Sequence, residues 1–386
     1  MEYWHFSEMP YPFLPSPENY DSIRVTMPSS YMEPETAADL MSRYIKDWTV
    51  ADKAGINIMI NEHHGTATCM NSAAPLMAAA LSQVTVRAKI LILGNPVANR
   101  RDPVRVAEEM ALLDLMTRGR LEVGFVRGVP YEISATNSSP TKMNERMWEA
   151  IDLIRKTWTN HNGPFNWEGA FFQHRQVNIW PRPYTQPHPP IWVTAMSQSS
   201  VPLVADADAV AATFLTGVEG TKRIFDSYRS RWHETGKGEV PLDRFGYAAM
   251  TFVGETDAEG MAGAEQLMWY LKSNKVPQEF ILPPPGYSPY FARAGGSAGR
   301  WFGLRPCQHV DGPIGGIRNN VCRRPGHRGR ADQELLRQNR WSGPLDFAQP
   351  GRLHGSRDSS FWNPELRRAR KAAPRRSFRE TGKPSQ

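Results

Sequence analysis

The sequence has few cysteines and no long apolar run. Its three cysteines, Cys69, Cys307 and Cys322, form no CxxC pair and no zinc-ligand spacing, which argues against a disulfide scaffold and a structural zinc site. No stretch approaches the roughly 18 apolar residues of a membrane span. The opening MEYWHFSEMPYPFLP lacks the zones of a signal peptide. These absences predict a protein of the reducing cytoplasm that does not associate with membranes.

Three common site motifs are also missing. There is no GxGxxG and no GxxxxGK[ST], which disfavours a Rossmann dinucleotide site and a P-loop. The zinc-protease pattern HExxH is absent as well, so we expect no catalytic metal. Any cofactor must therefore be held by another arrangement of residues.

Basic charge is concentrated at the end of the chain. Residues 291–386 contain 18 Arg and 2 Lys against 7 acidic residues, a net charge of +13, which leaves −6 on residues 1–290. This tail is rich in Gly and Pro and has no period-2 apolar runs, so it is expected neither to fold into the body nor to close its sheet.

Three interpretations of the tail stay open. It is a disordered basic extension, a nucleic-acid-binding arm, or the product of a shifted reading frame in a GC-rich gene. We favour the last, because Arg greatly outnumbers Lys and the composition changes abruptly near residue 291. Nucleic acid is not expected as a partner.

Strand-like and helix-like segments alternate through the body. This alternation favours an α/β protein with a parallel sheet, a barrel in particular. We expect helices between seven strands, with an aromatic hairpin or loop near residues 165–180. The strands are expected at residues 3–6, 56–60, 89–93, 121–126, 191–194, 209–214 and 245–253. A closed (β/α)₈ barrel needs one more βα unit, so we predict a barrel domain at 1–290 that is incomplete at its C-terminal unit.

Chemically capable residues stand where strands end, which is where parallel α/β proteins assemble their sites. Glu62, His63 and His64 directly follow the second expected strand. A histidine there can act as a general base or as a hydrogen-bond donor to a cofactor. It can equally be a loop cap or a buried structural residue. These residues alone do not decide between a functional and a structural role.

Candidate anion-binding residues follow later strands. Arg127 and Gly128 follow the fourth strand, and Arg146 lies in the first turns of the next helix, where phosphate is favoured. The alternative is surface pairing of the arginines with acidic neighbours. Ser197 and Ser200 follow the fifth strand and can bind phosphate or simply cap a helix.

Several motifs together carry a resemblance. They are NEHHGT, ILGN, DPVRVAEEMALLDLMTRGRLEVGFVRG, NERMWEAIDLI and PHPPIWVTAMSQSS, in that order. Over about residues 1–275 the chain resembles the bacterial luciferase-like flavin-dependent monooxygenases. The resemblance implies a (β/α)₈ barrel that binds reduced FMN, or sometimes a deazaflavin, at the carboxyl ends of its strands.

The same resemblance assigns roles to individual residues. His63 matches the catalytic histidine, with Glu62 and His64 beside it. Gly94-Asn95 matches a cis, non-proline peptide under the flavin ring, and Arg127 followed by Gly128 matches the arginine beside the flavin. The set that matches the phosphate site consists of Arg146, Ser197 and Ser200.

The resemblance also implies the reaction and the partners. The protein would use reduced FMN and O₂ to oxygenate a small organic substrate. The flavin would be dissociable and would be reduced by a separate flavin reductase. A protein with an intact barrel would form a homodimer. Two departures stand out: Met196 replaces a small residue or a glutamate, and no Gly-Thr-Pro segment opens a closing unit. The rivals are a deazaflavin-dependent hydride transferase, a basic nucleic-acid-binding protein and an inactive frameshifted product.

Overall fold

The computed structural model describes residues 1–16, 19–133, 135–273, 276 and 320–323. The chain divides into two units, 1–347 and 348–386, and every described residue lies in the first. The expectations for the basic tail therefore fall outside the described residues, apart from 320–323. No described helix has both the length and the hydropathy that a membrane span requires.

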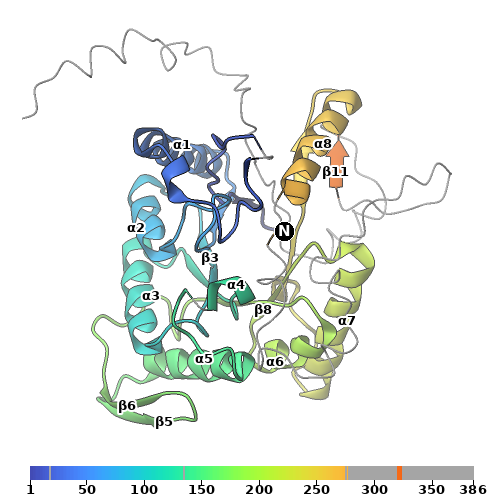
Figure 1. The fold of residues 1–386 in the computed structure, drawn as a ribbon. Coiled ribbons are helices and arrows are strands. Elements are labelled where there is room, and N and C mark those ends of the chain that lie inside the picture. The colour runs from blue at the N-terminus through green and yellow to red at the C-terminus, as the bar shows by residue number, and fades with distance from the viewer. Residues whose placement is uncertain (17–18, 134, 274–275, 277–319, 324–386) are drawn as a thin grey trace, which may run out of the picture. The chain divides into compact units, whose positions relative to one another are not determined.

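Seven parallel strands form the central sheet, in the order β1-β2-β3-β4-β7-β8-β9 (Figure 1). Each strand adds to the one before it, so β1 and β9 are the two ends of the sheet. The predicted parallel α/β sheet of barrel type is confirmed, and within the described residues it contains seven strands. The strands are β1 (Trp4–Phe6), β2 (Asn57–Ile60), β3 (Ile90–Asn95), β4 (Leu121–Phe125), β7 (Ile191–Thr194), β8 (Val210–Phe214) and β9 (Phe245–Ala248).

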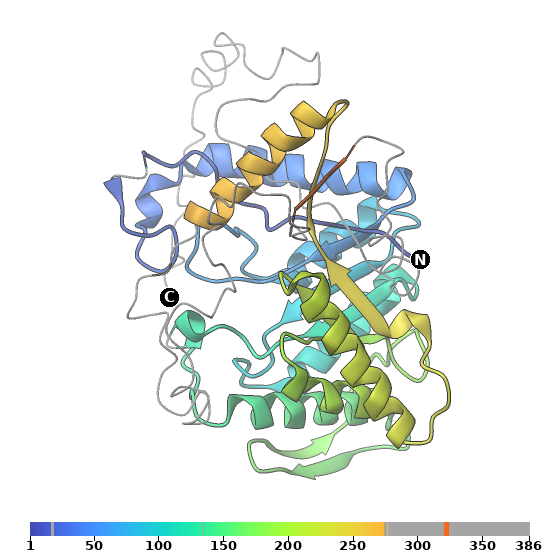
Figure 2. The ribbon, with the colours of Figure 1, turned by 90° about the vertical axis from the view of Figure 1, so that its right-hand side faces the viewer.

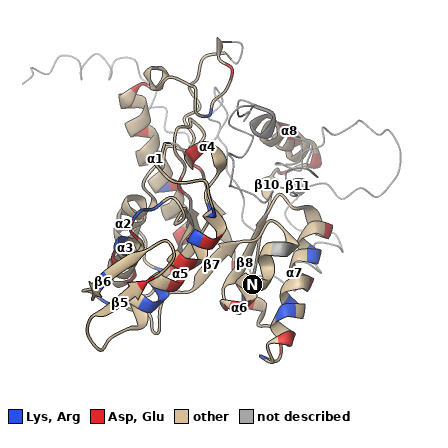
Figure 3. Ribbon diagram, turned by 60° about the horizontal axis from the view of Figure 1, so that its bottom comes forward, with Lys and Arg blue, Asp and Glu red and all other residues tan. Residues whose placement is uncertain are grey.

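Helices fill the connections between these strands (Figures 1 and 2). Their apolar faces carry the spacing seen in the sequence: α1 buries Leu40, Tyr44 and Trp48, and these pack with sheet residues in one core cluster. Charged residues of both signs lie along the helices, as on α7 (Figure 3). The longer helices are α1 (Pro34–Lys53), α2 (Ala74–Val84), α3 (Pro103–Thr117), α5 (Met143–Thr159), α6 (Val201–Asp206), α7 (Gly217–Glu234) and α8 (Asp257–Ser273).

Local signals set the ends of α3. The Asp102 carboxylate accepts the N–H groups of Val104 and Arg105 at 3.0 and 3.1 Å, and Pro103 opens the first turn. The helix ends at Arg118, which adopts a left-handed conformation (φ 53°) before Gly119. An aspartate N-cap, a proline in the first turn and a left-handed residue before a glycine are common signals for the start and the end of a helix.

Alternate residues of the strands enter two separate cores. On β3, Ile90 and Ile92 join the cluster formed with the helices, whereas Leu91 and Leu93 join a second cluster. That second cluster contains Trp4, Trp192 and residues of the later strands, so it lies on the other face of the sheet. Leu267 of α8 belongs to it, which places part of α8 against the face that a closed barrel would enclose.

The last expected strand is divided in two. Residues 245–253 form β9 and β10 (Met250–Val253), which are separated by Ala249. β10 leaves the main sheet and pairs in parallel with β11 (Asn320–Arg323). The sequence did not predict β11, because its residues lie in the arginine-rich tail without an apolar period. Since β11 pairs with β10, it does not join β1 to close the sheet.

The aromatic segment near residues 165–180 is an antiparallel hairpin, which is one of the two structures predicted for it. β5 (Phe165–Glu168) pairs with β6 (Gln173–Val177). The Glu149 carboxylate of α5 holds its turn by accepting the backbone N–H groups of Ala170, Phe171 and Phe172 at 3.0–3.2 Å. The hairpin is thereby fixed to the start of α5.

Candidate active site

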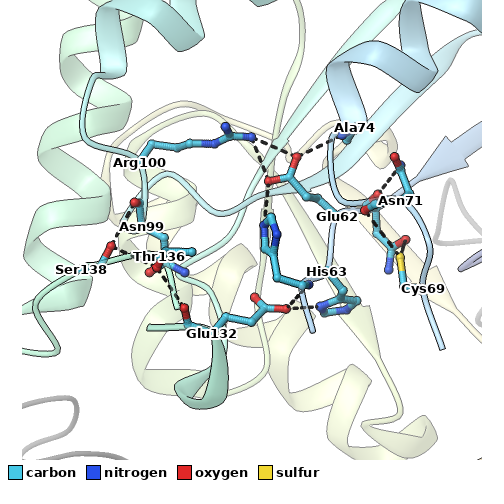
Figure 4. A network of polar contacts seen from close by, with 12 residues as sticks. Glu62, His63, Cys69, Asn71, Ala74, Asn99, Arg100, Glu132, Thr136 and Ser138 are labelled. Atoms are coloured by element: carbon cyan, nitrogen blue, oxygen red, sulfur yellow. Dashed lines mark hydrogen bonds and ion pairs between the residues drawn. The ribbon is translucent and has the colours of Figure 1, made fainter. Parts of the chain in front are cut away.

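Polar side chains gather at the carboxyl ends of β1 to β4. Because parallel strands end at the same edge of a sheet, residues that follow different strands become neighbours there. Glu8 comes after β1, residues 61–64 after β2, residues 99 and 100 after β3, and Glu132 after β4 on the single-turn α4 (Pro130–Ile133). Figure 4 shows the network that most of these residues form.

Glu62 is the buried centre of one half of this network. Its carboxylate accepts both hydrogen bonds of Arg100 Nη2, at 2.8 and 2.9 Å, and the backbone N–H of Ala74 at 3.0 Å. Ala74 begins α2, whose preceding residue provides no side-chain cap. Glu62 therefore satisfies a free amide at the positive end of a helix as well as a guanidinium.

His64 completes this half. Its Nε2 lies 3.3 Å from Glu62 Oε1. The hydrogen bond with Glu62 raises the pKa of His64 above its ordinary 6.5, against the opposing effect of burial, and the charge of Glu132 adds to the rise. His64 is therefore more readily protonated than a free histidine, and it serves with Arg100 to balance the buried Glu62 charge.

His63 points to the other half. Its Nδ1 lies 2.9 Å from Glu132 Oε1, and its Nε2 lies 3.8 Å from Glu8 Oε1. Glu132 is 2% exposed, whereas the His63 side chain is 22% exposed. Adjacent histidines thus serve different carboxylates, as expected for neighbours whose side chains diverge. His63 thus has its Nδ1 on buried Glu132, and His64 has its Nε2 on buried Glu62.

Two loops run beside each other over this edge of the sheet. The loop after β1 and the loop after β2 are joined by backbone hydrogen bonds, Tyr11 N to Ala67 O at 2.8 Å and Met70 N to Met9 O at 3.0 Å. The hydroxyl of Tyr131 on α4 accepts a hydrogen bond from Arg24 in the first loop. The site is therefore covered by segments that are bonded to one another.

A cis peptide lies at the end of β3. It joins Leu93 to Gly94, one bond earlier than the predicted Gly94–Asn95. The pairing of β3 with β4 shifts register between Ile92 and Asn95, at the same place. A Cβ on Gly94 would come 2.1 Å from Val126 Cγ1, so the absence of a side chain at this position is required by the neighbouring strand.

Two buried amides near the end of β3 lack partners. Both side-chain polar atoms of Asn95 and of Asn99 are without a hydrogen bond among the described residues, although these residues are 1% and 5% exposed. Gly128 has φ +92°, and a Cβ there would approach Asn99 Nδ2 to 2.7 Å. The glycine after β4 thus makes room for Asn99. Unsatisfied buried amides fit a site for a ligand with polar edges.

Arg146 lies in the first turns of α5, as predicted. Its guanidinium stacks 4.9 Å from the centre of the Phe172 ring and makes no ion pair among the described residues, and its buried Nε is unsatisfied. Burial lowers its pKa from the ordinary value, but a guanidinium stays charged. Glu149, one turn later, is occupied by the hairpin amides. No carboxylate among the described residues lies within ion-pair distance of Arg146, although the charge of Glu149 acts on it.

The remaining predicted residues follow β4 and β7, which are adjacent in the sheet. Arg127 and Gly128 come just after β4 and are half-buried. The hydroxyls of Ser197 and Ser200 lie 3.4 Å apart, and Ser200 donates to the carbonyl of Ser197 at 2.8 Å. Ser197 and Ser200 occupy the N-cap positions of two short helices, with no side-chain capping hydrogen bond recorded for either.

Four residues of the site were not predicted. Glu8, Asn99, Arg100 and Glu132 carry no motif that marks them, and Glu132 meets His63 across 69 positions of sequence. The one available signal was the placement of Asn99 and Arg100 just after a strand. Within the described part of the chain, no group of three or more His, Cys, Asp or Glu side chains is arranged to hold a metal ion.

The chemistry of this edge follows from its groups. It contains an imidazole with one nitrogen on a buried carboxylate, a second imidazole neutralising another carboxylate, unsatisfied amides, and a guanidinium without an ion pair. Such a set can hold an anion and polar ring edges and can transfer a proton.

Comparison with known proteins agrees with this arrangement. A family model described as luciferase-like monooxygenase matches residues 33–300. The oxygenase component of a flavin-dependent trigonelline monooxygenase from Acinetobacter baylyi is 27% identical over 264 residues, which are 64% of this chain and 71% of that protein.

Solved structures show the same fold. The monooxygenase RslO1 from Streptomyces bottropensis aligns with a TM-score of 0.59 at 20% identity, over 71% of this chain and 78% of its own. The oxygenating constituent of 3,6-diketocamphane monooxygenase from Pseudomonas putida, a type II Baeyer–Villiger monooxygenase in complex with FMN, aligns with a TM-score of 0.57 at 19% identity, over 70% and 74%.

Proposed function

Because the chain belongs to the luciferase-like monooxygenase family, we propose that it uses reduced FMN and O₂ to oxygenate a small organic substrate. The observation that carries the proposal is the placement of His63 on the buried Glu132, at the strand edge that also holds the unsatisfied amides of Asn95 and Asn99. Family membership supplies the reaction class, and this edge supplies groups suited to it.

The residues present fit an FMN molecule. Arg146, with Ser197 and Ser200, would bind the phosphate, because a guanidinium without an ion pair and two neighbouring hydroxyls are suitable donors for it. Arg127 and Gly128 would lie beside the flavin, and the segment Gly94-Asn95 would lie under its ring. When bound and reduced, the flavin supplies the electrons that activate O₂.

The protein contributes binding, proton transfer and exclusion of water. His63 would act as the acid or base, through Nε2, because its Nδ1 is occupied by Glu132. Glu62 already accepts Arg100 and Ala74, so its part would be to hold His64 rather than to exchange protons. The paired loops over the strand edge would keep water from the reacting atoms.

We propose three features of its working state. The relative from Acinetobacter is named as an oxygenase component, which supports a dissociable flavin reduced by a separate flavin reductase. Exposed apolar side chains on α2 and α3, among them Leu76 (74%) and Leu112 (51%), support a homodimer. The low cysteine content supports a cytoplasmic location.

Flavin preference tests the proposal. Purified protein supplied with chemically reduced FMN should consume O₂ faster than reduced FMN does alone, and this protein-dependent rate should fall in His63→Ala. The rival hydride transferase predicts instead that a reduced deazaflavin binds and transfers hydride without O₂ uptake. Tight binding of the deazaflavin alone, with no effect on the oxidation of reduced FMN, would reject the monooxygenase assignment.

A further inference from the structure

One oxygen of Glu132 serves two donors on consecutive residues. Glu132 Oε1 lies 2.9 Å from His63 Nδ1 and 3.0 Å from the backbone N of His64. The carboxylate is 2% exposed and sits on α4, in the segment after β4. Figure 4 shows it reaching the histidine pair from the side opposite Arg100. Neither the sequence nor the family resemblance singled it out.

We infer that Glu132 is a positioning residue that keeps the proton of neutral His63 on Nδ1, so that Nε2 is the nitrogen that exchanges a proton during turnover. The inference rests on the proposed function of His63. It adds the tautomer of that residue and the group that sets it.

The direction of the two hydrogen bonds fixes the tautomer. The backbone N–H of His64 can only donate, so Glu132 Oε1 is an acceptor in that bond. An ionised carboxylate is acceptor-only, so it must also accept from His63 Nδ1, which then carries a hydrogen. Neutral imidazole has one N–H, and Nε2 is left with its lone pair.

The other ring nitrogen is available. The carboxylate nearest to His63 Nε2, Glu8 Oε1, is 3.8 Å away, which is too long for a hydrogen bond. The His63 side chain is partly exposed, whereas Glu132 is not. A proton taken up at Nε2 would lie on the side of the ring that faces Glu8, opposite the nitrogen held by Glu132. The proton then leaves from the same nitrogen.

The tautomer can be measured without any assay of turnover. In protein labelled with ¹⁵N-histidine, the chemical shifts of neutral His63 should report hydrogen on Nδ1, and His63→Ala assigns the signal. In Glu132→Ala the hydrogen should move mainly to Nε2, and Glu132→Gln, which keeps the side-chain shape, should give a mixture. Asp52→Asn is the matched control. Like Glu132, Asp52 is a carboxylate that accepts backbone N–H groups, in its case those of Val86, Arg87 and Ala88. It lies outside the network of His63 and Glu132. This variant should leave the His63 signals unchanged.

Kinetics test whether the tautomer matters. With reduced FMN and O₂ as the only substrates, and with the oxidation of free reduced FMN subtracted, Glu132→Gln should lower the protein-dependent O₂ consumption about 10–100-fold, the scale for outer partners of functional histidines. The double variant with His63→Ala should be no slower than His63→Ala alone, because Glu132 acts through His63. The dissociation constant for FMN should stay within about two-fold in both.

Each outcome separates the inference from the function on which it rests. Retention of the Nδ1 hydrogen in Glu132→Ala overturns the tautomer assignment whatever the activity. If the losses of O₂ consumption in the two single variants multiply in the double variant, Glu132 does not act through His63 and its role is structural. If the His63→Ala variant turns over normally, the proposed role of His63 is wrong. The inference that Nε2 exchanges a proton during turnover is then wrong as well.

Discussion

Replacement of Arg146 by alanine tests the phosphate site directly. The guanidinium stacks on Phe172, makes no ion pair among the described residues, and keeps an unsatisfied buried Nε. Its acidic neighbour Glu149 is engaged by the backbone of the β5–β6 hairpin. A cation held in this way is available to a bound anion at little cost in existing contacts.

The expected loss is that of a hydrogen bond to a charged group, about 1.5–3 kcal/mol. This corresponds to a dissociation constant for FMN that rises roughly 10–150-fold. Riboflavin lacks the phosphate, so its affinity should scarcely change. Titration of oxidised FMN and of riboflavin, followed by flavin fluorescence, measures both losses on the same protein.

Two further variants make the result specific. Arg146→Lys keeps the charge without the planar fork and should fall between the wild type and alanine. Arg105→Ala removes an exposed arginine on α3 that pairs with Glu108 and Glu109, and it should leave FMN affinity unchanged. Loss of the Phe172 contact costs stability of about 0.5–1 kcal/mol, which thermal unfolding would report. Equal losses for FMN and riboflavin would refute the assignment of Arg146 to phosphate.

Three other changes should have distinct effects. His63→Ala should lower the protein-dependent O₂ consumption with reduced FMN, measured above the oxidation of free reduced FMN, roughly 10²–10⁴-fold with little change in FMN affinity, and near-normal turnover would contradict its role. Glu62→Gln should return the pKa of His64 toward 6.5, since its hydrogen bond to Glu62 is the largest cause of the rise. An NMR titration of His64 that is unchanged in this variant would contradict the explanation. Burial alone would raise the pKa of Asp52, but the N–H groups of residues 86–88 lower it below 3.8. The stability that Asp52 contributes is therefore present above pH 3.8 and lost as the pH falls below it. Asp52→Asn should cost about 1–3 kcal/mol in urea unfolding at pH 7, and a cost that persists unchanged at pH 2–3 would count against the explanation.

Much of the fold was predictable because its signals are local. The number and order of strands in the sheet, the buried face of α1 and the ends of α3 follow from apolar period and capping residues. The division of the last strand at Ala249 was not predictable, because residues 245–253 read as one continuous strand. Its partner β11 depends on pairing across some 70 positions, which no local pattern encodes.

The candidate site also contains residues that local patterns could predict and residues that they could not. Local patterns placed Glu62 and His63 after a strand and Arg146 in the first turns of a helix, and the structure has them at these positions. The partners that give these residues their character were missed. Glu132 and Arg100 reach His63 and Glu62 only after the strands are aligned, and Glu149 bonds to a hairpin turn rather than forming an ion pair with Arg146.

The serial order of the sheet has a consequence for how the protein is made. Each parallel strand docks on the one synthesised just before it, and the contacts that join Glu8, Glu62, His63, Arg100 and Glu132 all lie within the first 132 residues. A nascent chain that has emerged through α5 therefore already contains the whole of this network. Assembly from neighbouring units keeps loop-closure costs low at each step, so this polar network can form on the ribosome before β7, β8 and β9 exist.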